Sequence, residues 1–225
     1  MNTNLSPMLK QNARILLISN MNIGPTHNNS LSKKEMLYDT LKKSKLVSEI
    51  TIVSLDAIKD FNELILANYH CIIYDWLDYG CERTNPTKEI ENYIKNGGNI
   101  IVTHDHVYYI SNILGLKEIN NSDTNYIFNE VINVNSEHEI WRSYYNFEKI
   151  KIMEVTKTHG RLKVSNKETK TILVSNDNYN NLYLTTRNIG MGKAVFWNAG
   201  HTPNINENEK KLFLNIIAWV LKEEN

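Results

Sequence analysis

Residues 97–106, with the sequence GGNIIVTHDH, have the pattern of a buried strand that ends in proton-active side chains. A short apolar, β-branched run, residues 100–102, follows the Gly-Gly pair, which is typical of a strand buried on both faces. His104, Asp105 and His106 come where this strand is expected to end. Ligands of open α/β sheets bind outside the carboxyl ends of the strands. The stretch therefore predicts an α/β fold with a polar site at this edge of the sheet.

The composition indicates one cytoplasmic domain that binds neither nucleic acid nor membrane. The chain has 225 residues, and we expect a tail over residues 1–12 and a single domain over residues 13–225. The 25 basic side chains balance 25 acidic ones, and no basic stripe suits a phosphate backbone. No apolar run approaches the roughly 20 residues of a membrane span. Two cysteines, Cys71 and Cys81, and no apolar leader at the N-terminus favour a cytoplasmic location.

Strand and helix patterns alternate through the first half of the chain. The expected strands span residues 13–19, 49–55, 70–74 and 100–102. The expected helices span residues 31–46, 61–67, 86–95 and 107–114, the last ended by Gly115. Four consecutive β-then-α units predict a doubly wound, mostly parallel sheet with helices on both faces.

The second half is rich in strand patterns with few helices between them. Expected strands span residues 126–134, 151–155, 171–175 and 182–186. We expect an antiparallel β-ribbon that extends the main sheet, in which His138 caps a turn and Trp141 packs. Gly190 and Gly192 are expected to form a hairpin turn before a strand over residues 193–198, and an amphipathic helix over residues 207–222 ends the chain.

Several segments resemble the ThuA-like (trehalose utilisation) family of the class I glutamine amidotransferase-like superfamily. Residues 190–201, GMGKAVFWNAGH, are similar to the Gly-x-Gly-(Lys/Arg)-strand-x-x-Gly-His segment of that family. Residues 97–103 resemble its Gly-Gly strand, and Thr26-His27 matches a histidine-containing loop after the first strand. Residues 136–140, SEHEI, are similar to its Asp-x-x-His-Pro-Ile stretch, with Glu139 in place of the proline. The resemblance covers most of residues 13–222 and implies a flavodoxin-like core.

The resemblance does not extend to the amidotransferase residues. Relatives in the superfamily use a Cys nucleophile at the elbow after the Gly-Gly strand, with a His–Glu pair on a later loop. Here His104 or Asp105 occupies the elbow, and Pro203-Asn204 stands where a Glu would follow His201. A thiolate activated by histidine is the required nucleophile, so we exclude glutamine amidotransfer by this mechanism. Whether the protein is an enzyme stays open at this point.

Histidines from several loops are expected to converge on one polar pocket at the carboxyl edge. His104 and His201 form its predicted centre, and Asp105 fixes a histidine tautomer. The predicted supporting residues are His27, Trp76, Asp78, His106, Asn198, Thr202 and Asn204. An aromatic wall with polar neighbours suits a sugar or another polyhydroxylated small molecule. No cofactor is indicated.

Three alternatives remain for these residues. The first is a hydrolase or isomerase in which His104 or His201 is the base and Asp105 orients it. The second is a zinc site formed by His104 and His106 with His201 or His27. The third is a non-catalytic interaction protein, in which the β-ribbon supports a homo-oligomer.

Overall fold

Five parallel strands form the half of the sheet predicted from the alternating pattern. The computed structural model describes residues 12–19, 31–54, 61–75, 87–103, 110–119, 126–147, 150–160, 162–199 and 205–223. The parallel strands are β1 (Arg14–Ser19), β2 (Glu49–Ser54), β3 (Cys71–Asp75), β4 (Asn99–Val102) and β11 (Gly192–Trp197). They lie in the order β2-β1-β3-β4-β11, and every neighbouring pair is parallel. This is the flavodoxin-like order 2-1-3-4-5, so the predicted fold class is confirmed.

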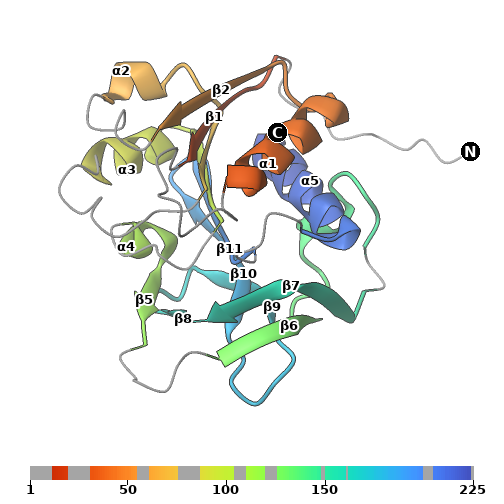
Figure 1. The fold of residues 1–225 in the computed structure, drawn as a ribbon. Coiled ribbons are helices and arrows are strands. Elements are labelled where there is room, and N and C mark those ends of the chain that lie inside the picture. The colour runs from red at the N-terminus through yellow and green to blue at the C-terminus, as the bar shows by residue number, and fades with distance from the viewer. Residues whose placement is uncertain are drawn as a thin grey trace, which may run out of the picture.

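Four antiparallel strands extend this sheet to nine strands beyond β11 (Figure 1). They are β10 (Leu182–Ile189), β9 (Lys170–Ser175), β6 (Tyr126–Asn133) and β7 (Ile152–Gly160), in that order. A separate pair, β5 (Leu116–Glu118) and β8 (Leu162–Val164), forms a second small sheet. The predicted antiparallel extension is therefore confirmed. The short pair was not predicted, because three residues are too few to establish an alternating pattern.

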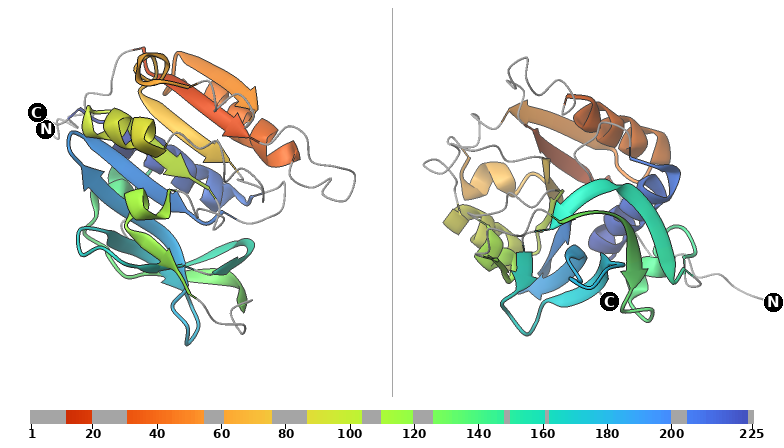
Figure 2. Two further views of the ribbon diagram at one scale, coloured as in Figure 1. Left: turned by 90° about the vertical axis from the view of Figure 1, so that its left-hand side faces the viewer. Right: turned by 60° about the horizontal axis from the view of Figure 1, so that its bottom comes forward.

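The helices divide between the two faces of the parallel strands, as Figure 2 shows. On one face, α1 (Leu31–Ser44) and α5 (Glu207–Leu221) pack on a core that includes Ile15, Ile73 and Val195. On the other face lie α2 (Glu63–Leu66), α3 (Thr87–Lys95) and α4 (Ser111–Leu114). The continuous apolar runs of β1, β3 and β4 follow from this arrangement, because these strands are covered on both sides. The edge strand β2 is less buried and contains polar residues.

The C-terminal ends of α1 and α4 are each explained by the backbone conformation of one residue. We expected the first helix to reach residue 46, but α1 ends at Ser44, because Lys45 adopts a positive φ of 60° that no α-helix continues. The predicted stop at Gly115 is confirmed, since this residue is the left-handed C-cap of α4 with φ 69°. Both ends are set by single residues rather than by the apolar pattern.

The Gly190-x-Gly192 segment forms the predicted hairpin turn between β10 and β11. Gly190 has a φ of 59°, and a Cβ on Gly192 would lie 2.0 Å from the backbone oxygen of Gly98. The turn therefore packs directly against the segment that joins α3 to β4. The geometry and packing of the turn therefore explain both glycines without a ligand.

The buried carboxylate of Glu209 joins the first turn of α5 to two strands of the extension. Its Oε1 accepts a hydrogen bond from the Tyr183 hydroxyl at 2.7 Å, and its Oε2 accepts one from the Thr156 backbone N–H at 2.9 Å and another from the Thr156 hydroxyl. Oε2 also accepts from the N–H of Asn206, the N-cap residue, at 3.0 Å, which completes a capping box. Glu209 thus stabilises the helix start and fixes its position against β7 and β10.

Candidate functional site

Three polar side chains meet at the carboxyl ends of β1, β3 and β4. Asp75, the last residue of β3, is 1% exposed. Its Oδ1 accepts a hydrogen bond from the Thr103 hydroxyl at 2.8 Å, and its Oδ2 accepts one from the Ser19 hydroxyl at 3.3 Å. Ser19 ends β1 and pairs with Asp75 in the sheet register, and Thr103 directly follows β4. The strand order reverses between β1 and β3, so this cluster lies at the topological switch point of the fold.

Most residues predicted for the pocket lie outside the described ranges. These are His27, Trp76, Asp78, His104, Asp105, His106, His201, Thr202 and Asn204. Their segments start from the ends of β1, β3, β4 and β11, which are neighbours or near neighbours at one edge of the sheet. Their placement in a common pocket, and the zinc alternative among them, stay predictions.

Asn198 is the predicted site residue that the structure describes, and its amide is hydrogen-bonded at both ends. The Thr158 hydroxyl donates to Asn198 Oδ1 at 3.2 Å, and Asn198 Nδ2 donates to the His159 backbone oxygen at 2.7 Å. The side chain is completely buried. In this arrangement Asn198 joins the carboxyl end of β11 to β7, and direct contact with a ligand remains a prediction.

Strand β7 is bonded to side chains from the end of β11 and from the start of α5. Beside the two bonds from Asn198, Asn206 Nδ2 donates to the Glu154 backbone oxygen at 2.8 Å. The Glu209 carboxylate holds the Thr156 N–H between these points. The antiparallel extension is consequently held against the carboxyl end of β11, and strand patterns in the sequence did not predict this contact.

The predicted structural roles of two aromatic residues are confirmed. His138 is the N-cap of the short 3₁₀ helix η4 (Glu139–Arg142), and its Nδ1 accepts a hydrogen bond from the Ile140 N–H at 3.3 Å. Burial, with a smaller contribution from the charge of Lys170, lowers the pKa of His138 to about 4. Trp141 is buried and donates from Nε1 to the Asn135 backbone oxygen at 2.7 Å.

Among the residues that the structure describes, no group of three His, Cys, Asp or Glu side chains is placed to hold a metal ion. Cys71 is completely buried in the core under α1 and α5. No helix in the described parts of the chain is long and apolar enough to cross a membrane.

The comparison with solved structures identifies proteins of the same fold. A ThuA-like protein from Bacteroides uniformis superposes with a TM-score of 0.68 at 16% identity, over 100% of this chain and 96% of that chain. The chain has a ThuA-like fold. A cytoplasmic protein from Salmonella typhimurium LT2 gives a TM-score of 0.67 at 11% identity, over 93% of this chain and 100% of that one. The expected resemblance is thus confirmed at the level of the fold.

The same fold also occurs as part of a larger enzyme. A β-galactosidase from Bacillus circulans sp. alkalophilus superposes with a TM-score of 0.59 at 12% identity. The match covers 98% of this chain and 33% of the β-galactosidase. No protein-family model matches the sequence, and no curated protein is significantly similar to it.

Sequence reasoning missed Asp75 as a site residue, because the expected strand ended at residue 74. An acidic residue that directly follows an apolar strand, here CIIY before Asp75, was the available signal. The strand contains this carboxylate and buries it, so Asp75 belongs to the floor of the carboxyl edge rather than to the loop above it.

Proposed function

We propose that this protein binds a small polyhydroxylated molecule, such as a sugar, at the carboxyl edge of its parallel strands. The observation that carries the proposal is the buried Asp75 carboxylate at the switch point, held by Ser19 and Thr103. Burying a carboxylate costs free energy. Proteins therefore keep a buried carboxylate most readily where the group has a function. Carboxylate and hydroxyl groups are also the usual hydrogen-bonding partners of sugar hydroxyls.

The residues that would contact the ligand come from the segments that start at this edge. His104 and His201 are the proposed central contacts, and Asp105 would orient an imidazole. His27, Trp76 and the other predicted residues would complete the wall. ThuA-like proteins and parts of β-galactosidases share the fold, which is the reason to begin a search with sugars.

A calorimetric titration with D-galactose, D-mannose and D-glucose tests this proposal. We expect saturable binding of at least one sugar and a loss of affinity of about tenfold or more in His104→Ala and His201→Ala, because each removes a hydrogen bond to the ligand. Lys88→Ala, on the exposed side of α3, is the matched control and should bind like the parent protein. The proposal is wrong if no sugar binds, or if both histidine variants bind as tightly as the control.

A second measurement, on the same protein variants and sugars, distinguishes a binding protein from the proposed alternative, a hydrolase or isomerase. Nuclear magnetic resonance of the sugar after prolonged incubation reports conversion. Conversion that disappears in His104→Ala or His201→Ala while the control retains it would assign acid–base catalysis to these histidines. An unchanged sugar would assign binding alone.

A further inference from the structure

A small pocket lies between α2 and α3, at the edge of the sheet opposite the proposed sugar site. It is lined by Glu63 of α2, by the C-cap residue Ala67, by residues 69–70, and by Tyr93 and residues 96–98 at the end of α3. Two of these segments lead into β3 and β4, so the pocket lies at the amino edge of the parallel strands. Its volume of about 230 Å³ is below the roughly 300–1,000 Å³ of sites for drug-sized ligands, so it suits a molecule of few non-hydrogen atoms.

The floor of the pocket is aromatic, and the Gly-Gly pair before β4 makes room for it. Tyr93 is 6% exposed, and its hydroxyl donates a hydrogen bond to the Tyr69 backbone oxygen at 3.1 Å. A Cβ on Gly98 would lie 2.2 Å from the Tyr93 ring, so a larger residue would displace the ring. The tyrosine is therefore held in place by its own hydroxyl and by close packing on the backbone.

Glu63 carries the charge of the lining, and a neutral group holds its carboxylate. Its Oε1 accepts a hydrogen bond from Asn92 Nδ2 at 2.6 Å, across the contact between α2 and α3. Among the residues that the structure describes, none forms an ion pair with Glu63. Because an amide carries no charge, this bond orients the carboxylate without neutralising it.

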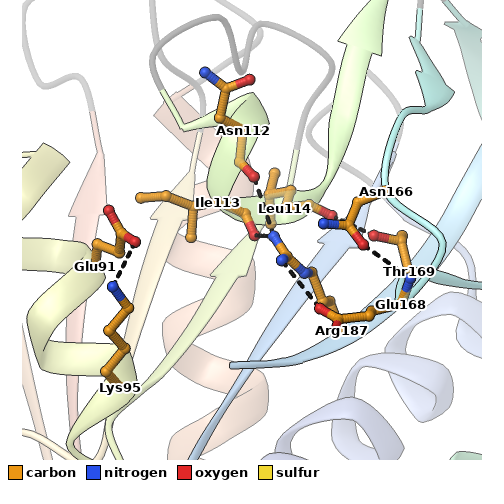
Figure 3. Close-up of polar contacts among 9 residues, drawn as sticks. All are labelled: Glu91, Lys95, Asn112, Ile113, Leu114, Asn166, Glu168, Thr169 and Arg187. Atoms are coloured by element: carbon orange, nitrogen blue, oxygen red, sulfur yellow. Dashed lines mark hydrogen bonds and ion pairs between the residues drawn. The ribbon is translucent and has the colours of Figure 1, made fainter. Parts of the chain in front are cut away.

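The lining contains no positive charge to offset this carboxylate. His70 accepts the Arg14 backbone N–H on Nδ1 at 3.0 Å, so that nitrogen carries no proton and the ring is uncharged. Two basic side chains of the surrounding elements lie outside the lining. Lys95 binds Glu91 at 2.7 Å, as Figure 3 shows, and Arg14 lies directly opposite Glu49 in the register of β1 and β2.

The end of α3 makes the pocket more favourable for a cation. The helix ends at Lys95, and residues 96–98 bring its C-terminal end to the pocket. The carbonyl end of a helix carries a partial negative charge that attracts cations. The faces of tyrosine rings attract an ammonium group in the same way, and the Asn96 amide oxygen is a neutral acceptor.

We propose that this pocket is a second binding site, for a small primary amine. The ammonium group binds the Glu63 carboxylate and the Asn96 amide oxygen, and a short carbon chain lies on Tyr69 and Tyr93. The proposal does not depend on the sugar site at the carboxyl edge, and the two are tested with different ligands.

Titration of the full-length protein with n-butylamine and n-butanol at pH 7, followed by nuclear magnetic resonance, tests the pocket. The two molecules have the same shape, but only the amine is charged. We expect saturable binding of n-butylamine and at least tenfold weaker binding of n-butanol, because hydrogen bonds between charged groups are the stronger ones. Added salt should weaken the binding of the amine. Absence of saturable amine binding, or equal affinity for the alcohol, would overturn the proposal.

Variants locate the binding. Glu63→Gln changes an exposed side chain and should lower the affinity for n-butylamine tenfold or more without affecting the fold. Ala67→Leu, also at an exposed position, adds bulk to the pocket and should lower the affinity as well. Glu35→Gln, at an exposed position of α1 on the other face of the sheet, is the matched control and should bind like the parent protein. Equal affinity in Glu63→Gln and Glu35→Gln would show that the amine binds elsewhere and would refute the assignment of this pocket.

Discussion

Replacement of Glu209 should weaken the fold more than any exposed charge substitution on α5. In Glu209→Ala the carboxylate is lost, and the N–H groups of Thr156 and Asn206 and the hydroxyls of Thr156 and Tyr183 lose their acceptor. An unsatisfied buried donor costs about 1–3 kcal/mol, and part of this cost is recovered by relaxation, so we expect a destabilisation of about 4 kcal/mol.

Glu209→Gln should cost less, about 2 kcal/mol, for a geometric reason. The glutamine oxygen can take the place of Oε2, which accepts three of the four bonds, and the amide nitrogen can then donate to the Tyr183 hydroxyl. The charge-assisted part of each bond is lost. In Tyr183→Phe, Oε1 loses its hydrogen bond from the Tyr183 hydroxyl while Oε2 keeps its three bonds, so a cost of about 1–3 kcal/mol is expected.

Urea unfolding, followed by circular dichroism, measures these differences. Glu207→Gln is the matched control, because Glu207 is exposed in the same helical turn and its removal should leave the midpoint unchanged. The reasoning fails if Glu209→Ala has the stability of this control, or if Glu209→Gln is less stable than Glu209→Ala. A double-mutant cycle between Tyr183 and Glu209 gives the energy of their hydrogen bond.

Two further perturbations test other parts of the fold. His138 has a pKa of about 4 when folded and an ordinary value near 6.5 when unfolded, so its contribution is present above pH 6.5 and is lost as the pH falls toward 4. After allowance for its partial exposure, urea unfolding at pH 7 and pH 4.5 should show about 2 kcal/mol less acid destabilisation in His138→Gln than in the parent; an equal pH dependence would contradict this origin. Gly192→Ala places a Cβ against the backbone oxygens of Gly98 and Ile94 and should cost about 2 kcal/mol or more in urea unfolding, whereas Met191→Ala, at an exposed position of the same turn, should not; equal midpoints for the two variants would refute this packing.

The parallel half of the fold could be predicted because its signals are local. The inner strands β1, β3 and β4 contain apolar runs buried on both faces, and each strand is followed by a helical pattern. The run at residues 100–102 is completely or almost completely buried in β4, as its composition predicts. The error at the end of α1 came from a single backbone conformation, the positive φ of Lys45, which an apolar pattern does not encode.

The strands of the antiparallel extension were predicted, but their order and pairing in the sheet were not. The pairing of β6 with β7 contains a register shift between Phe128 and Glu130, and the order β10-β9-β6-β7 differs from the order along the chain. Both depend on contacts between residues far apart in sequence. Strand β7 also continues to Gly160, five residues beyond the expected end, because residues 158–160 pair with residues 126–128 of β6, far away along the chain.

The candidate site, too, could be predicted only in part from the sequence. That polar residues follow the strands was evident from the sequence, and Asp75 lies at the edge where the site was expected. That Asn198 is fully hydrogen-bonded to β7 could not be foreseen, because its partners lie about 40 residues away along the chain. The same is true of the contact between the Lys193 ammonium group and the Trp219 ring, which come from β11 and α5.

The bonds along β7 also bear on how copies of this protein meet. β7 is an outermost strand of the nine-stranded sheet, and such strands can recruit another chain through their open backbone groups. Here the Glu154 and His159 oxygens and the Thr156 N–H are already bonded to side chains of the same molecule. Intermolecular strand pairing at this border would have to break those bonds first.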